Sequence, residues 1–266
     1  ARRFGTGQPG CREKARRRGD GDGRENMNNI HFIGIAGIGM SGLAEISVSR
    51  GKKVTGSDLR PNDLTENLVR KGAKVFRGHD AGYLPGDADI VVRSSCIRAD
   101  NPEVRRAEEL GIPVISRSDM LKDMLGKARV SVGVTGTHGK TTTSALVSYM
   151  IDKCGKDPTV IIGGEMEHFG GNARRGSDDL IVAEVDESDG LFRDIGVTHA
   201  IVTNVEREHM ENFASMEELV GAYRQFISRI PSGGVLVFNG EDGILRDISS
   251  STRAVKADFG IDGDFA

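Results

Sequence analysis

The sequence predicts an α/β fold in two successive units: an N-terminal Rossmann-like, doubly wound parallel sheet, and then a P-loop-type α/β domain. Three observations support this. From Ile30 onward, short apolar runs alternate with helical patterns, as in parallel sheets. Two glycine-rich turns, at residues 34–42 and 133–141, each follow an apolar run and open a helical pattern. The length of 266 residues is typical of about two domains.

The first unit is predicted over residues 27–127. Apolar runs predict its strands, and helical periodicity predicts its helices, two of which end at Gly72 and Gly111, the usual stop residues. The predicted strands are 30–35, 53–56, 74–76, 90–93 and 113–115, and the predicted helices are 40–49, 64–71, 102–110 and 117–125.

The second unit is predicted over residues 128–266, after a short linker near Gly126–Lys127. Its predicted strands are 129–134, 159–162, 180–185, 200–203 and 235–238, with helices at 141–154 and 216–230. Residues 1–26 are rich in Arg and Gly and nearly free of apolar side chains, so burial cannot offset their ordering entropy. They are predicted to be a disordered extension upstream of a start at Met27, the alternative being a basic arm for nucleic acid or membrane.

Composition limits the partners and the compartment. The net charge is −3 and the sequence pI is about 6.1, so no basic footprint for nucleic acid is predicted. No apolar run reaches the roughly 18 residues of a membrane span. Cys11, Cys96 and Cys154 show no pairing pattern, as is typical of a reducing compartment. We therefore expect a cytoplasmic protein with no nucleic-acid or membrane partner.

The second glycine-rich turn is the strongest functional motif. A β-type run ends at Val134, Gly136-Thr137-His138-Gly139 follows, and Lys140-Thr141 opens a helix. Such a turn holds phosphate oxygens on backbone N–H groups, its lysine reaches the terminal phosphates and its threonine hydroxyl suits Mg²⁺. A chance Gly-Lys-Thr is the weaker alternative. The predicted ATP-binding residues are Gly136, Thr137, His138, Gly139, Lys140, Thr141 and Thr142.

Two further motifs follow strands of the second unit. Glu184-Val185-Asp186-Glu187-Ser188-Asp189 ends the run at 180–185, where folds with a phosphate loop bind Mg²⁺. An acidic solvent-exposed loop is the alternative. His209 follows the run at 200–203 and is either a second metal ligand or phosphate contact, or an ordinary loop histidine.

The first unit carries Gly37-x-Gly39-x-x-Gly42 between strand and helix, with Asp58 about 20 residues further on. Glycines there allow close approach to a pyrophosphate, and the carboxylate suits a ribose hydroxyl of NAD or of a UDP-sugar. Glycines that serve only helix–sheet packing are the alternative. Ser94 and Ser95 follow another strand and can donate to phosphate oxygens, and His79 could contact a base.

Taken together and in this order, the motifs resemble those of the Mur ligases, most closely the members that add the first amino acid. The resemblance covers about residues 30–260. Its residues are 31–42, Gly56-Ser57-Asp58, Ser94-Ser95, 100–103, 136–143, 183–189 and Thr203-Asn204. Cys96 and Glu208 depart from the family pattern, which often has Ala and Asp there.

The resemblance implies ATP-dependent ligation of L-alanine to UDP-N-acetylmuramate through an acyl phosphate, with ATP and Mg²⁺ as cofactors, in peptidoglycan synthesis. A ligase that joins a peptide to the same UDP-sugar, and an NAD-dependent oxidoreductase, are the alternatives. It implies catalytic roles for Lys140, Glu184 and His209, and metal binding by Thr141, Glu184 and His209. The implied UDP-sugar residues are Gly37, Ile38, Gly39, Met40, Asp58, His79, Ser94 and Ser95.

Mur ligases have three domains, so the resemblance also implies that this chain ends within an incomplete ATP-binding domain and lacks the amino-acid-binding domain. We therefore expect it to bind both nucleotides weakly and to turn over hardly at all. Whether it forms a homodimer stays open.

Overall fold

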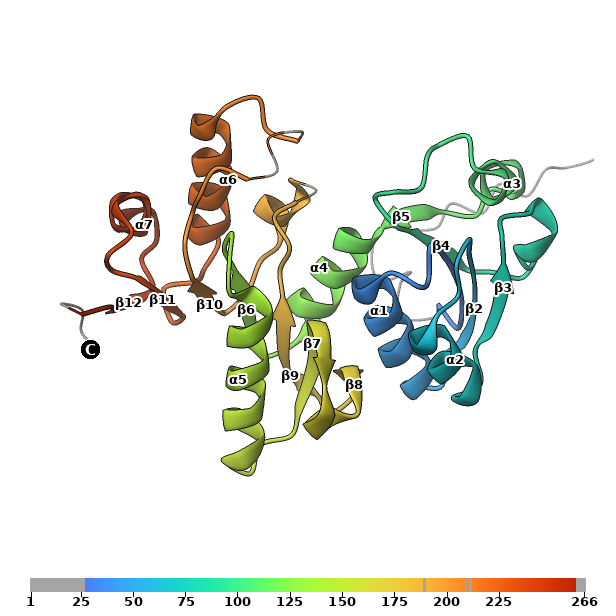
Figure 1. The fold of residues 1–266 in the computed structure, drawn as a ribbon, viewed down its shortest axis with the longest axis horizontal. Helices are drawn as coiled ribbons and strands as arrows, with labels where there is room; N and C mark the ends of the chain where they lie inside the picture. Colours follow the sequence, from blue (N-terminus) through green and yellow to red (C-terminus); the bar gives the residue numbers. More distant parts are fainter. Residues whose placement is uncertain (1–26, 189, 209, 211, 262–266) are drawn as a thin grey trace, which may run out of the picture.

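The computed structural model describes residues 27–188, 190–208, 210 and 212–261. These residues form two sheets side by side, joined through α4 (Arg117–Lys127), as Figure 1 shows. The extension predicted at residues 1–26 and the end of the chain from 262 lie outside the described residues.

The first sheet has five strands in the order β3-β2-β1-β4-β5, and all its pairs are parallel. This order and the helical crossovers make it doubly wound, as the sequence predicts. Its strands are β1 (Asn29–Ile33), β2 (Lys53–Asp58), β3 (Lys74–Arg77), β4 (Ile90–Arg93) and β5 (Val114–Ser116). Its helices are α1 (Ile38–Ser49), α2 (Asp63–Arg70) and α3 (Pro102–Leu110), with the single turn η1 (Ala81–Tyr83).

The second sheet has seven strands in the order β12-β11-β10-β6-β9-β7-β8, parallel except for the β7–β8 hairpin. Its strands are β6 (Val130–Thr135), β7 (Pro158–Met166), β8 (Gly171–Arg174), β9 (Ser177–Glu184), β10 (His199–Val202), β11 (Val235–Asn239) and β12 (Val255–Phe259). Its helices are α5 (Lys140–Lys153), α6 (Met216–Ser228) and α7 (Gly243–Ile248), with the turns η2 (Glu167–Phe169), η3 (Leu191–Asp194) and η4 (Ser249–Ser251).

Four elements differ from the sequence prediction. The strands β8 and β12 and the six-residue helix α7 were not predicted. Helix α4 continues through Gly126 to Lys127, so the predicted linker residues are helical. No helix within the described part of the chain is both long enough and apolar enough to cross a bilayer.

Helix α1 packs on both sheets. It contacts β1 and β2 of its own sheet and also the β7–β8 hairpin of the other. A Cβ atom on Gly42 would lie 3.3 Å from Ile161 Cγ2 and 3.2 Å from Asn172 Nδ2, so this glycine allows the hairpin to approach the helix. Asn172, which is 2% exposed, donates to the Ile38 carbonyl and to Ser41 Oγ. The third glycine of the first motif therefore serves packing between the two units.

Candidate functional site

The phosphate-loop motif forms the predicted turn between β6 and α5. Gly136 has φ +129° and Gly139 has φ +81°, a region that side chains rarely adopt. Gly139 is the N-cap residue of α5 and provides no side-chain cap, so the turn and the first helical residues present backbone N–H groups at the positive end of the helix. This arrangement suits an anion such as a triphosphate.

Residues after β10 fix this loop from the neighbouring strand. Asn204 Oδ1 accepts from the His138 N–H at 2.8 Å, and Asn204 Nδ2 donates to the His138 carbonyl at 3.1 Å. Thr203 Oγ1 donates to the same carbonyl at 2.6 Å. In the sequence, Thr203-Asn204 is notable only as a dipeptide that resembles the family. These residues lie 65 and 66 residues from His138 in the chain, so motif spacing does not indicate their contacts with the loop.

The Lys140 side chain bends back to the loop. Its ammonium donates to the carbonyls of Gly136 and Thr137 and to Glu187 Oε1 at 2.9 Å. The side chains of Lys140 and Glu187 are 14% and 2% exposed. Burial raises the pKa of the Glu187 carboxyl above its ordinary value, although the Lys140 ammonium acts in the opposite direction. Glu187 was predicted only as part of the acidic motif, and the structure gives it the specific role of partner to Lys140.

Thr141 and Glu184 meet beside the loop. Thr141 Oγ1 donates to Glu184 Oε2 at 2.9 Å, and the Gly163 N–H donates to the same oxygen at 2.9 Å. A hydroxyl beside a carboxylate is an oxygen pair of the kind that Mg²⁺ prefers. His209, the third predicted metal ligand, lies outside the described residues. Among the residues that the structure does describe, no three His, Cys, Asp or Glu side chains form a metal-ligand group.

Of the remaining predicted ATP residues, His138 and Thr142 are exposed and Thr137 is buried. His138 is 55% exposed in its side chain, and its Nε2 lies 3.6 Å from a carboxylate oxygen of Glu206 and 3.6 Å from one of Glu208. Thr142 is exposed in the first turn of α5. Thr137 is buried, and its Oγ1 accepts from the Glu206 N–H at 2.8 Å. Thr137 therefore supports the loop, whereas the side chains of His138 and Thr142 are accessible to a ligand.

The first glycine-rich turn leads from β1 to α1. Gly37 is the N-cap residue without a side-chain cap, and Ile38 and Gly39 form the start of the helix. Asp58, at the end of β2, accepts from the Ala36 N–H at 3.0 Å and from the Arg60 N–H at 2.9 Å. Met40 is only 2% exposed and packs in the core, so its backbone, not its side chain, is available to a ligand.

A buried polar network lies beside His79. Glu103, which is fully buried, accepts from Ser57 Oγ and lies 2.8 Å from His79 Nδ1 and 2.7 Å from His31 Nε2. The two imidazoles and the Ser57 hydroxyl thus share one buried carboxyl group. No role of its own was predicted for His31 from the sequence. Its partner Glu103 is 72 residues away, and no local pattern indicates the pair.

Two cavities are each lined by residues of both units. Ser94, Ser95 and Cys96, after β4, line a cavity of about 490 Å³ whose other wall includes Ser188 and Asn212. A smaller cavity of about 90 Å³ is lined by Gly39, Gly163, Glu184 and Asp186, among others. Arg117 lines both cavities. The predicted UDP-sugar residues Ser94, Ser95, Ile38 and Gly39 thus lie near the acidic loop that follows β9.

Arg117 is a site residue that sequence reasoning missed. Its Nη2 donates to Asp186 Oδ2 at 3.1 Å. Burial raises the pKa of Asp186, but the Arg117 guanidinium, Ser188 and Lys140 outweigh burial, so the pKa is lowered overall and the carboxylate is charged at neutral pH. The partners are 69 residues apart in the chain.

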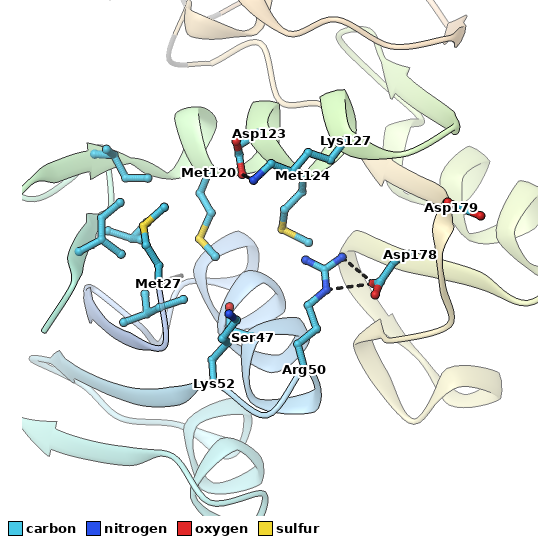
Figure 2. A pocket seen from close by; sticks show the side chains of 14 residues that line it. Met27, Ser47, Arg50, Lys52, Met120, Asp123, Met124, Lys127, Asp178 and Asp179 are labelled. Atoms are coloured by element: carbon cyan, nitrogen blue, oxygen red, sulfur yellow. Dashed lines mark hydrogen bonds and ion pairs between the residues drawn. The ribbon is translucent and has the colours of Figure 1, made fainter. Parts of the chain in front are cut away.

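A third cavity, of about 410 Å³, lies away from these residues at the amino ends of the strands. Ile30, Ile90 and Ile115 form part of its apolar wall. Figure 2 shows Met120 and Met124 pointing into it from α4, with Arg50 and Asp178 joined at its side. That ion pair connects α1 to β9, with Arg50 Nη2 and Asp178 Oδ1 2.7 Å apart. None of the predicted site residues lines this cavity.

Two family models match the chain. Residues 29–129 match the Mur ligase family, catalytic domain, and residues 134–265 match the Mur ligase middle domain. UDP-N-acetylmuramate–L-alanine ligases from Syntrophus aciditrophicus and Aquifex aeolicus are 43% and 41% identical to the chain. Each alignment covers 90% of this chain, and 49% and 52% of the relatives, respectively. The chain thus spans about half the length of the curated relatives it matches.

Solved structures give the same result. The UDP-N-acetylmuramate–alanine ligase of Thermotoga maritima superposes with a TM-score of 0.80 at 33% identity, over 88% of this chain and 53% of that one. A ligase from Neisseria meningitides named for UDP-N-acetylmuramate and L-alanyl-γ-D-glutamyl-meso-diaminopimelate also gives 0.80, at 30% identity, over 88% of this chain and 78% of that one. With both models matching in order and these relatives aligned across both sheets, the chain belongs to the Mur ligase family.

Proposed function

We propose that this chain carries the UDP-sugar and ATP sites of an ATP-dependent ligase that joins L-alanine to UDP-N-acetylmuramate in peptidoglycan synthesis. The observation that supports this most strongly is the phosphate loop, in which Lys140 donates a hydrogen bond to Glu187 and Thr141 donates one to Glu184. The loop lies close to the first glycine-rich turn, that of α1. The names of the relatives at 41–43% identity support alanine as the amino acid. We propose a cytoplasmic location because ATP is a co-substrate.

We assign one nucleotide to each of the two sheets. Residues 27–127 would bind the UDP-sugar through the α1 turn, Asp58, His79 and the serines after β4. Residues 128–266 would bind ATP through the β6–α5 turn. Each turn joins the carboxyl end of a parallel strand to the N-terminus of a helix. Each therefore offers backbone N–H groups to a phosphate.

The residues present fit Mg²⁺. The Thr141 hydroxyl and the Glu184 carboxylate are hard oxygen donors within 2.9 Å of each other, beside the lysine of the loop. His209 is proposed as a further ligand from the sequence. When bound, the cation would neutralise negative charge on the terminal phosphates.

The chemistry requires a carboxylate to approach a triphosphate, although both are anions. A carboxylate oxygen of the sugar attacks the γ-phosphorus, ADP leaves, and the acyl phosphate forms. The alanine amine then attacks the acyl carbon, phosphate leaves, and the amine loses a proton as the amide forms. Lys140 and the loop N–H groups stabilise the charge that develops on the transferred phosphoryl group. Arg117 lines a cavity beside Ser94 and Ser95 and another beside Glu184, so the proposed UDP-sugar site lies close to the carboxylates beside the phosphate loop, as joining the two substrates requires.

A ligase that joins a peptide to the same UDP-sugar is the second candidate, because the Neisseria structure matches over 78% of its length. The two candidates share both nucleotide sites and differ in the amine. Comparing L-alanine with a tripeptide as the amine substrate of a full-length protein would separate them.

A thermal-shift titration tests the nucleotide sites. The chain is mixed separately with UDP-N-acetylmuramate, Mg-ATP and NAD⁺. A ligand at about 100 times its Kd adds about 2.7 kcal/mol to the stability of the folded state. We expect the first two ligands to raise the Tm by several degrees and NAD⁺ to leave it unchanged. Stabilisation by NAD⁺ alone, or by none of the three, would overturn the proposal.

Two lysine variants sharpen this test. Lys140→Ala should lose the Tm shift with Mg-ATP and keep the shift with UDP-N-acetylmuramate. Lys156→Ala removes an exposed lysine beyond the end of α5 and should keep both shifts. Loss of both shifts in Lys140→Ala would contradict the assignment of the two ligands to separate domains.

A further inference from the structure

Arg117 occupies a position fixed by two elements. Strand β5 ends at Ser116, which is also the N-cap residue of α4, and a capping box between Ser116 and Asp119 sets where the helix begins. Arg117 is therefore the first helical residue, at the carboxyl edge of the first sheet. Its side chain, 18% exposed, reaches Asp186 in the loop after β9 of the second sheet.

The same guanidinium lies against the first glycine-rich turn. A Cβ atom on Gly39 would lie 2.7 Å from Arg117 Nη1 and 3.1 Å from its Cδ. Gly39 lies in the first turn of α1, whose N-cap residue Gly37 provides no side-chain cap. The second glycine of the motif thus leaves room for an arginine beside the helix end that would hold a pyrophosphate.

The surroundings of Arg117 differ on its two sides. On one side lies the cavity of about 490 Å³ with Arg93, Ser94 and Ser95, which are cationic or hydroxyl groups suited to an anion. On the other side lies the cavity of about 90 Å³ with Glu184 and Asp186. Arg117 is therefore the cation between the proposed UDP-sugar site and the carboxylates beside the phosphate loop.

We propose that Arg117 binds the pyrophosphate of the UDP-sugar and, through Asp186, couples occupancy of that site to the ATP site. The inference rests on the proposed function. A guanidinium carries five N–H donors in a plane, so it can donate to Asp186 with one edge and to a phosphate oxygen with another. Binding of the pyrophosphate draws the guanidinium toward α1 and changes the charge that Asp186 presents two residues from Glu184. Coupling of this kind is reciprocal between the two ligands.

The competing explanation is that Arg117 only ties the two units together. The chain offers a matched control, because Arg50 also joins the units, through its ion pair with Asp178 at the opposite end of the strands (Figure 2). Arg50 Nη2 lies 2.7 Å from Asp178 Oδ1, and the Arg50 side chain is 25% exposed, so the two pairs are similar in kind. A purely structural role predicts similar effects when either arginine is removed.

Calorimetric titration with UDP-N-acetylmuramate and with UDP tests the contact. The proteins are the wild-type chain and the variants Arg117→Ala, Arg117→Lys and Arg50→Ala. We expect Arg117→Ala to weaken both ligands by about 10- to 100-fold, as for a lost hydrogen bond to a charged group. Arg117→Lys should fall between, because a lysine provides the charge without the planar fork. Arg50→Ala should match the wild type.

Two other outcomes would overturn the pyrophosphate contact, and a third would remove the proposed function as well. Wild-type affinity in Arg117→Ala, or an equal loss in Arg50→Ala, would overturn the pyrophosphate contact while leaving the proposed function intact. Failure of the wild-type chain to bind either UDP compound would remove the proposed function and the inference with it.

The coupling is measured by repeating the UDP-N-acetylmuramate titration with a non-hydrolysable ATP analogue and Mg²⁺ at saturation. The ratio of affinities with and without the analogue should differ from one in the wild type and in Arg50→Ala. It should return toward one in Arg117→Ala and in Asp186→Asn. A ratio of one in the wild type, or an unchanged ratio in both site variants, would overturn the coupling through Asp186.

Discussion

The two glycine-rich turns have the same plan but are fixed in different ways. Both connect a parallel strand to a helix whose N-cap glycine has no side-chain cap. In the β6–α5 turn, Gly136 and Gly139 have positive φ, and the side chains of Thr203 and Asn204, just after β10, form hydrogen bonds to the loop. In the β1–α1 turn, Gly34 also has a positive φ, +83°, whereas Gly37 has φ −62° and Asp58 accepts one loop N–H. The clearest difference lies at the first glycine of each Gly-x-x-Gly or Gly-x-Gly pair: a Cβ atom fits at Gly37 but not at Gly136.

Substitution of one glycine in each turn should give the largest contrast. In Gly136→Ala the new Cβ would overlap Thr203 Oγ1 and lie 3.0 Å from backbone atoms of Asn204, at a strained φ. We expect a loss of about 3 kcal/mol or more in the free energy of unfolding, and loss of ATP binding. In Gly37→Ala the nearest atom is 3.6 Å away, so the loss should stay below about 1 kcal/mol. Urea unfolding of both variants measures this, and equal losses would contradict the comparison.

Lys140→Met should give the next largest effect, with a dependence on pH. Removing the ammonium leaves the buried Glu187 carboxylate without its cation and raises its folded-state pKa further. A raised carboxyl pKa destabilises the fold above that pKa, and the loss is relieved as the pH falls and the carboxyl is protonated. Relative to wild type, the variant should lose about 2 kcal/mol at pH 8 and less at pH 5.

The measurement for this variant is urea unfolding of wild type and Lys140→Met at the two pH values. Lys156→Met, an exposed lysine, serves as the control and should show no loss at either pH. A loss that is equal at pH 8 and pH 5 would show that Glu187 does not titrate as inferred.

The side chains that fix the two turns should separate the two ligands. Asn204→Ala removes two hydrogen bonds to His138, and Asp58→Ala removes those to the N–H groups of Ala36 and Arg60. We expect each variant to lose about 1 kcal/mol of stability. Calorimetric titration should show weaker ATP binding only in Asn204→Ala and weaker UDP-sugar binding only in Asp58→Ala. Loss of the same ligand in both variants would contradict independent turns.

The smallest effect is expected far from both turns, at Asp178. Burial raises its pKa, but Arg50 and Arg175 outweigh burial, so the pKa is lowered overall. A depressed folded-state pKa stabilises the protein above the ordinary carboxyl pKa, and this stability is lost as the pH falls through the folded value. Asp178→Asn should therefore lower stability by about 0.5 kcal/mol at pH 7 and by less as the pH falls below the ordinary carboxyl pKa. A change in the affinity for either nucleotide would show that this pair is not remote from the sites.

The fold was largely predictable because its signals are local. Apolar runs, helical periodicity and glycines at helix ends predicted both parallel sheets. Strand β8, Gly171-Asn172-Ala173-Arg174, has no strand-like sequence, and its place depends on packing against β7 and α1. Strand β12 does alternate, with apolar residues at 255, 257 and 259, so its sequence carries a strand pattern.

The candidate site was predictable only where its chemistry lies within one motif. Lys140, Thr141 and Glu184 come from short motifs with known spacing, and their binding roles remain predictions. Arg117 begins an ordinary helix, and nothing around it in the sequence indicates a partner 69 residues away. Glu103 likewise reads as a residue in the first turn of a helix, although it lies fully buried between two histidines. Long-range pairs of this kind require the arrangement of strands to be known first.

Helix α1 has a consequence for how the molecule unfolds. One continuous apolar core contains Met40 and Leu43 of this helix, Ile161 and Ala173 of the β7–β8 hairpin, and the residues beneath α6. Unfolding of either unit therefore exposes apolar side chains of the other unit that pack against it. Because this exposure is unfavourable, loss of one unit lowers the stability of the other. Heat should accordingly unfold both sheets in one cooperative transition, with equal calorimetric and van't Hoff enthalpies.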